Sequence, residues 1–229
     1  MSDTHFDLVG DWPSPWILVR LLQVVNSPWE PGEEGFVHRR TGEACRVGFS
    51  GRPDLRLVSA IHDGACPVTP SIDEDLLEQA RDHKAVTVVW VEGEPSVARG
   101  RTLVRAVAGI IDAGAVALRC RRSGLSHGAD AFQAIAARLE APETADEALV
   151  DALIYRQLVG DAQTSGMDLL GLPDIALQRD VGPDRAADVL TQAAVALIRG
   201  EGLEGLRAGG RSWSVAEVPS LQGARLHLR

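Results

Sequence analysis

The amino-acid sequence predicts an α/β or α+β protein in which helices are interleaved with a mixed β-sheet in a single globular domain. Apolar runs of strand length alternate along the chain with segments whose apolar residues recur every three or four positions. The chain has 229 residues, of which 45% are hydrophobic and 24% charged, as in proteins that bury a substantial core. Residues 1–15 lack periodicity and are predicted to be an irregular lead-in, whereas residues 16–229 are assigned to one α/β domain.

Five segments in the first 118 residues are predicted to be strands, because they are short and mostly apolar. They cover residues 16–25, 45–49, 55–61, 85–91 and 115–118. The turn from Ser50 to Asp54 has hairpin length and favours antiparallel pairing of the two strands beside it. Residues 26–42 are predicted to be a loop, since prolines and glycines interrupt any strand there.

Four helices are predicted from apolar residues at helical spacing and from residues that favour helix ends. They cover residues 71–82, 102–112, 129–139 and 183–199. Ser71 and Glu74 match a capping box at the start of the first helix. Pro183 opens the last helix and Gly200 follows its end, which is the usual asymmetry of helix termini.

Residues 149–159 fit both a helix and a strand. We favour a strand, because the turn at Gly160 and Asp161 would let it pair with a second strand near residues 175–178. Farther along the chain, residues 211–218 and 224–228 are predicted to form a terminal hairpin.

The charge balance bears on the class of partner. Thirty-two acidic residues against 23 basic ones give a net charge of −9, which repels the phosphates of nucleic acids and of anionic lipids. No apolar stretch reaches the ~20 residues that a membrane span requires, and the N-terminus is polar and acidic. We therefore expect an acidic, soluble, cytoplasmic protein with no nucleic-acid or membrane partner.

The cysteines and the single lysine limit the kinds of disulfide, metal and catalytic site that the protein can contain. Cys45, Cys66 and Cys120 are far apart and odd in number, so we predict reduced and mostly buried thiols. His62, Asp63 and Cys66 are potential metal ligands, but no second closely spaced pair accompanies them, and we predict no metal site.

Lys84 is the only lysine, and no glycine-rich stretch precedes it, which excludes a P-loop and a kinase lysine. We predict that Lys84 is a solvated charge where a strand begins. Because no dinucleotide fingerprint is present either, we expect no cofactor and assign no catalytic residue.

The segment from Arg119 to Gly128 is the first candidate ligand site. It is predicted to join the carboxyl end of a strand to the amino end of a helix, a place where anions bind in open α/β sheets. The candidate ligand-binding residues are Arg121, Arg122, Ser126 and His127. In the alternative, purely structural interpretation, Ser126 caps the helix and the arginines extend their charges into solvent.

Tryptophans supply the second candidate site. Trp12 and Trp29 stand among prolines on either side of the first predicted strand, and they are either structural anchors or an exposed edge that binds another protein.

One corner of the sequence resembles a known family. Residues 164–174 contain Thr164-Ser165-Gly166-Met167 and Gly171-Leu172-Pro173-Asp174. They are similar to the T-x-G-M…G-L-P-[DE] corner of a bacterial family catalogued as domain of unknown function forty-two sixty-one. By their composition, Gly166 and Gly171 are expected to have positive φ angles. The resemblance covers about residues 55–218, and the chain departs from it where Cys120, Arg121 and Arg122 replace an aromatic stretch.

The resemblance implies no catalytic activity. Relatives of the family occur near bacterial toxin and immunity genes, which suits a protein-binding role. Our leading hypothesis is therefore a non-enzymatic protein-binding module of toxin-immunity or regulatory type. The alternative is an enzyme or sensor of a small anion bound at residues 121–128.

Overall fold

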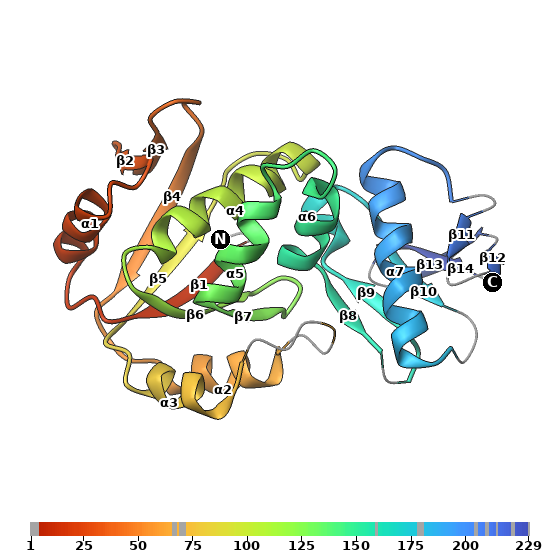
Figure 1. Ribbon diagram of the computed structural model, residues 1–229, viewed down its shortest axis with the longest axis horizontal. Coiled ribbons are helices and arrows are strands. Elements are labelled where there is room, and N and C mark those ends of the chain that lie inside the picture. Colours follow the sequence, from red (N-terminus) through yellow and green to blue (C-terminus); the bar gives the residue numbers. More distant parts are fainter. Residues whose placement is uncertain are drawn as a thin grey trace.

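Two β-sheets connected by helices form a mixed α/β fold, as the sequence predicts (Figure 1). The computed structural model describes residues 5–65, 68, 72–158, 160–177, 181–203, 206–208, 211–213, 215–220 and 223–228. One cluster of buried hydrophobic residues extends from Phe6 to Leu203, so the elements of both sheets share a core.

The larger sheet has seven strands in the order β2-β3-β4-β5-β1-β6-β7, and every pair of neighbours is antiparallel. The strands are β1 (His5–Gly10), β2 (Trp29–Pro31), β3 (Gly35–His38), β4 (Ala44–Ser50), β5 (Ala85–Trp90), β6 (Ala115–Cys120) and β7 (Ser126–Gly128). The strands predicted over residues 45–49, 85–91 and 115–118 are confirmed as β4, β5 and β6.

The prediction of an irregular lead-in holds for residues 11–14 but is wrong for residues 5–10, which form β1, and for Pro15, which begins α1. β1 lies inside the sheet, hydrogen-bonded to β5 on one side and β6 on the other. Its two polar residues, His5 and Asp7, are both 2% exposed. They break the apolar pattern by which a buried strand is recognised, which is why the sequence did not reveal it.

Residues 16–25 and 55–61 are helical, contrary to the predicted strands. α1 (Pro15–Val24) begins at Ser14, whose hydroxyl accepts a hydrogen bond from the N–H of Ile17 at 3.4 Å. α2 (Leu55–Asp63) begins at Asp54, whose carboxylate accepts from the N–H groups of Arg56 and Leu57. In both helices a cap ahead of an apolar run selects the helix, and no hairpin forms between residues 45–49 and 55–61.

The loop predicted over residues 26–42 contains the hairpin formed by β2 and β3. β2 is an edge strand of the sheet, where Pro31 and its missing N–H group are tolerated. The prolines therefore shorten the strand without abolishing it.

Helices cover both faces of the larger sheet. The remaining helices are α3 (Glu74–Arg81), α4 (Val97–Ile111), α5 (Ala129–Arg138), α6 (Ala145–Leu153) and α7 (Pro183–Ile198). Leu8 belongs to the core shared with α4 and α5, whereas Val9 belongs to a second core with α2 and α3. Successive residues of β1 thus point to opposite helical layers.

The four predicted helices are confirmed as α3, α4, α5 and α7, with shifted boundaries. The cap of α3 is Asp73, whose carboxylate accepts from the N–H of Leu76 at 2.9 Å. Ser71, predicted to be the cap, lies outside the described residues. α4 begins five residues early at Val97, with Ser96 as its cap.

The smaller sheet has the order β13-β14-β10-β9-β8, with β10 and β14 parallel and the other pairs antiparallel. Its strands are β8 (Tyr155–Gln157), β9 (Gln163–Ser165), β10 (Asp174–Leu177), β13 (Val215–Ser220) and β14 (Gly223–Leu228), and β11 (Leu206–Ala208) pairs separately with β12 (Arg211–Trp213). The terminal hairpin predicted over residues 211–218 and 224–228 is confirmed for β13 and β14, whereas residues 211–213 form β12, which pairs with β11 instead.

Residues 149–159 divide between two elements: α6 ends at Leu153 and β8 begins at Tyr155. The strand prediction is therefore wrong for the first part of this segment. β8 pairs with β9, which lies between it and β10, so the pairing with residues 175–178 is not direct. Val159 and Gln178 lie outside the described residues.

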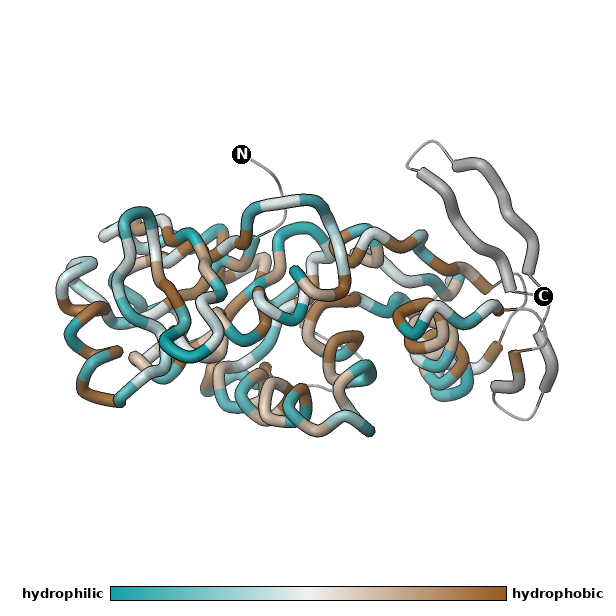
Figure 2. The backbone as a smooth tube through the Cα atoms, turned by 90° about the horizontal axis from the view of Figure 1, so that it is seen from above, coloured by the Kyte–Doolittle hydropathy of each residue, from teal (hydrophilic) through white to brown (hydrophobic). Residues whose placement is uncertain are grey.

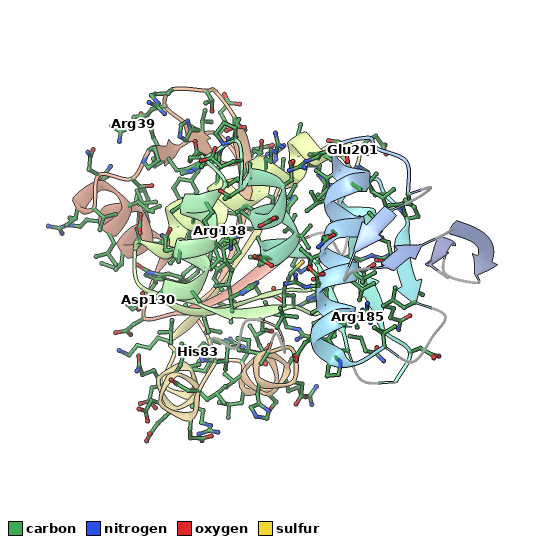
Figure 3. All side chains as sticks on the ribbon, turned by 45° about the vertical axis from the view of Figure 1, so that its right-hand side comes forward. Arg39, His83, Asp130, Arg138, Arg185 and Glu201 are labelled. Atoms are coloured by element: carbon green, nitrogen blue, oxygen red, sulfur yellow. The ribbon has the colours of Figure 1, made fainter. Side chains whose placement is uncertain are left out.

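A buried ionic network joins the two halves of the molecule. The carboxylate of Asp151 on α6 accepts from Arg156 on β8 at 2.7 Å and from Arg138 on α5 at 2.9 Å (Figure 3 labels Arg138). Arg156 is 1% exposed and also donates to Thr191 of α7 at 2.6 Å. A buried guanidinium requires such partners, so this network fixes α6 and α7 against each other.

Candidate functional site

The segment from Arg119 to Gly128 forms a β-hairpin rather than the predicted connection from a strand to a helix. β7 pairs antiparallel with β6, and β6 pairs antiparallel with β1 on its other side. The ligand crevice expected at this place belongs to parallel sheets, in which a crossover helix follows each strand. The antiparallel order removes that crevice.

Both candidate arginines are paired with carboxylates from other elements. Arg121 donates from Nε to Asp7 at 3.1 Å, and Arg122 donates from Nε to Asp168 at 2.6 Å. Asp7 is on β1, whereas Asp168 is in the short 3₁₀ helix η1 (Met167–Leu170). The two positive charges therefore stabilise contacts within the fold.

Ser126 and His127 are fully buried. Ser126 accepts a hydrogen bond from Nη1 of Arg119 at 3.3 Å, and the His127 ring packs edge-on against Phe132 with ring centroids 5.5 Å apart. Burial lowers the pKa of His127 to about 4, against the opposing effects of the Ala152 carbonyl and Asp151. The ring is neutral at physiological pH.

The alternative role for Ser126 is also wrong, because the cap of α5 is Gly128 and no side chain caps that helix. Arg121, Arg122, Ser126 and His127 do not line the described hollows of the surface. Their interactions hold the hairpin in place, and the geometry gives no support to a small-anion site there.

Arg119, which is not among the candidate residues predicted from the sequence, connects the β6–β7 hairpin to α2 by hydrogen bonds. Its Nη1 donates to the carbonyl oxygens of Ala60 and Gly124. The chain at Gly64 passes so close that a Cβ there would lie 2.1 Å from Arg119 Nη1. The N–H of Ser126 bonds to the Gly64 carbonyl at 2.9 Å, which continues the contact between α2 and β7.

The corner at residues 164–174, which carries the family resemblance, is held by its own motif residues. Asp174 accepts from the Thr164 hydroxyl and from the Met167 N–H, both at 3.1 Å. Gly166 and Gly171 have φ angles of 105° and 72°, as predicted. The corner is a structural device, since these contacts lie within the fold.

Trp12 and Trp29 do not form an exposed binding edge. Trp12 is fully buried and donates from Nε1 to the Ala113 carbonyl at 2.6 Å. Trp29 is 3% exposed and packs against α4 at Gly109, where a Cβ would lie 2.2 Å from Cδ1 of the indole. Both are anchors between distant parts of the chain.

Among the tryptophans whose exposure the structure describes, Trp16 is the exposed one, with 81% of its surface accessible. Arg20 and Val24 follow it at four-residue intervals and share its face of α1, and Ile17 and Val25 lie beside them. We call these five residues the α1 surface. Leu18 and Leu22 point the other way into the core. α1 lies at the end of the molecule opposite α7 (Figure 1), where Figure 2 shows hydrophobic residues in brown.

The α1 surface is apolar to an unusual degree for an exposed helix. Val24 is 73% exposed, Val25 43% and Ile17 37%. Arg20 is its only charged residue and makes no ion pair within the described part of the chain. Contiguous exposed apolar residues of this kind mark interaction sites.

The remaining candidate residues have ordinary roles. Cys45 and Cys120 are free, buried thiols, as predicted, and burial raises the pKa of Cys45 to about 12. Cys66 lies outside the described residues. Lys84 is exposed, as predicted, and pairs with Asp11 at 2.5 Å.

The described residues contain no group of three histidine, cysteine or acidic side chains placed to hold a metal ion. His62 and Asp63 are both exposed at the end of α2. Nor is any helix in the described ranges long and apolar enough to cross a bilayer.

Comparisons with known proteins add no constraint. No family model, no curated protein and no solved structure matches the chain. The resemblance at residues 164–174 therefore rests on its motif residues alone.

Proposed function

We propose that the protein is a non-enzymatic module that binds another protein through the α1 surface. The observation that carries this proposal is the exposure of Trp16 beside Val24, on a helix whose opposite face is already anchored in the core. Tryptophan is enriched among the residues that dominate protein–protein binding energies.

The size of the expected interaction supports this assignment. A tryptophan side chain buries about 150–250 Å² when it is covered, which at ~25 cal/mol per Å² corresponds to a gross gain of about 4–6 kcal/mol. α1 is held by Ser14 at its start and by Leu18 and Leu22 along its inner face. A partner would therefore meet a preformed helix, with little ordering cost.

Arg20 specifies the chemistry of the partner. It lies between Trp16 and Val24 on the same face, so a symmetric contact between two copies of α1 would bring the two Arg20 side chains together. Like charges placed in an apolar contact disfavour the complex. The α1 surface instead fits a different protein that presents an apolar patch around a carboxylate.

The test compares capture of partners by three forms of the full chain. The wild-type protein, the Trp16→Ala/Val24→Asp variant and a control variant, Leu55→Ala, are immobilised and exposed to lysate of the source cells. Leu55 is a matched control because it is 63% exposed but lies on α2. We expect a protein retained by the wild type and by Leu55→Ala, and lost from the double variant.

The retained protein is then purified and titrated against Arg20→Glu. We expect at least tenfold weaker binding, restored when an acidic residue of the partner is changed to lysine. Equal retention by all three forms would overturn the proposal. So would self-association that Trp16→Ala abolishes, or binding of α1 to lipid vesicles in place of a protein.

A further inference from the structure

A groove between α4, α5 and the β2–β3 hairpin is separate from the α1 surface and has a volume of about 430 Å³. Its floor consists of small residues from the two helices, Ala108, Gly109, Ala136 and Ala137. We call it the α4–α5 groove. Its volume lies in the range of small-molecule sites, roughly 300–1,000 Å³.

Polar contacts close the two ends of this groove. At one end, Nε of Arg105 donates to Glu140 at 2.8 Å. At the other end, the amide of Gln133 donates to Asp112 at 2.6 Å and to the Ala108 carbonyl at 2.7 Å. The two helices thus run antiparallel, and the seven residues from Arg105 to Asp112 separate the ends by about 10 Å.

The β2–β3 hairpin, which forms one wall of the groove, contributes a hydrogen-bond donor that finds no acceptor within the described ranges. His38 is 9% exposed, and its Nδ1 accepts from the Thr41 N–H at 3.2 Å. In the neutral ring the proton is therefore on Nε2. Within the described ranges, no acceptor for that N–H is found, although the ring lines the groove.

One cation and one anion of the groove, Arg40 and Asp112, have no opposite charge beside them among the described residues. Arg105 is neutralised by Glu140 and by Glu43, whose carboxylate it contacts at 3.3 Å. Arg40, in the turn between β3 and β4, lines the groove and has no ion pair within the described part of the chain. Among the described residues, the Asp112 carboxylate accepts a hydrogen bond only from Gln133, and burial raises its pKa.

We propose that the α4–α5 groove binds a small zwitterion, a ligand that carries both a carboxylate and an ammonium group, in the size range of an amino acid to a tripeptide. The carboxylate accepts from His38 Nε2 and Arg40. The ammonium group donates to Asp112 and to the side-chain carbonyl of Gln133, and the aliphatic part of the ligand lies on the alanines.

Other ligand classes fit these groups less well. A phosphate dianion would meet Asp112 and Glu140 on the helix side of the groove, and a simple amine would leave Arg40 and His38 unused. The two opposite charges on opposite walls favour a ligand that satisfies both.

The test uses alanine, dialanine and trialanine as probes, titrated calorimetrically into the full chain. Each probe is compared with its N-acetylated form, which lacks the ammonium group, and its C-terminal amide, which lacks the carboxylate. We expect the best of the three probes to bind, and each blocked form of it to bind at least tenfold more weakly.

Variants locate the binding in the groove. Ala137→Leu, which fills the floor without changing charge, should weaken the probe at least tenfold. Ala134→Leu is its matched control, because Ala134 is exposed on the same helix and does not line the groove. Asp112→Asn should weaken the free probe but not its N-acetylated form, and Arg40→Gln should weaken the free probe but not its amide.

Several results would overturn the proposal. The first is no binding of any probe at about 10 mM, ten times a Kd of 1 mM. The second is equal affinity for the blocked and unblocked forms. The third is an equal effect of Ala137→Leu and Ala134→Leu on binding. All four variants change surface-accessible residues, and circular dichroism verifies that each one folds. The groove shares no residue with the α1 surface, so either proposal can fail while the other stands.

Discussion

The hairpin of β6 and β7 and the helix α1 differ in how they use their side chains. The hairpin carries arginines, a serine and a histidine, the types from which active sites are built, and it uses them to hold neighbouring elements. Arg121 and Arg122 are paired with carboxylates, and Ser126 and His127 are buried. α1 carries almost only apolar residues and leaves Trp16 and Val24 in solvent.

The difference shows that residue type alone is a poor guide to a binding site. What distinguishes a site is a group whose favourable interaction is not yet made, whether it is an exposed indole or an N–H without an acceptor. By that criterion α1 and the α4–α5 groove are candidates. The ring nitrogens of His127 in the hairpin also find no hydrogen-bond partner among the described residues, but this ring is fully buried and out of reach of a ligand, and Arg121 and Arg122 are paired.

The largest expected effect comes from replacing, one at a time, the two tryptophans on either side of the start of α1 with alanine. Trp12→Ala removes a fully buried side chain and its hydrogen bond to Ala113, and should lower the free energy of unfolding by about 3–5 kcal/mol. Trp16→Ala should change it by less than about 0.5 kcal/mol, because Trp16 is exposed. Urea unfolding measures both, and similar losses would mean that Trp16 is packed in solution.

Gly64→Ala tests how tightly the hairpin is held. The new Cβ would lie 2.1 Å from both Arg119 Nη1 and the Gly124 carbonyl, so we expect a loss of about 3 kcal/mol. Gly202→Ala is the control, because a Cβ there meets nothing within 4 Å. If thermal unfolding shows the two variants to be equally stable, the hairpin can move away from α2 at little cost.

Much of the fold was predictable from periodicity. β5 is a continuous apolar run and α7 has Pro183 and Gly200 at its ends, so local pattern and tertiary structure agree. α1 and α2 were predicted as strands because a run of apolar residues fits either element. In each case the deciding signal was a capping side chain, Ser14 or Asp54, just before the run.

The candidate sites were less predictable, because they depend on which side chains find partners. Nothing local to the sequence indicates that Arg121 meets Asp7, which is 114 residues away. Trp12 and Trp16 lie four residues apart, yet only the packing of α1 on the sheet decides which one is buried. The α4–α5 groove needs His38 and Asp112 on elements that only the fold brings together.

His127 makes the stability of the hairpin depend on pH. Its pKa of about 4 in the folded protein is below the ordinary value of 6.5, so the unfolded chain binds the proton first as the pH falls. Stability should therefore be complete above pH 6.5, decline between about pH 6.5 and pH 4, and lose up to about 3 kcal/mol in total.

The variant His127→Phe isolates this contribution. Its ring keeps the apolar packing against Phe132 and cannot be protonated. The difference in unfolding free energy between this variant and the wild type should shift in favour of the variant between pH 7 and pH 4. A constant difference over that range would show that the pKa of His127 is not lowered in the folded protein.

The smallest expected effect is that of the exposed ion pair between Arg122 and Asp168. Arg122 and Asp168 are 45% and 44% exposed, so a double-mutant cycle on the pair should give a coupling of about 0.2–1 kcal/mol that decreases with added salt. Asp168→Asn removes the carboxylate charge opposite Arg122 and should make the protein more responsive to inorganic phosphate than the wild type is. Thermal unfolding with and without phosphate measures the difference. A wild-type response as large as that of Asp168→Asn would mean that Arg122 is available to anions despite its partner, and the contrast between the hairpin and α1 would then no longer hold.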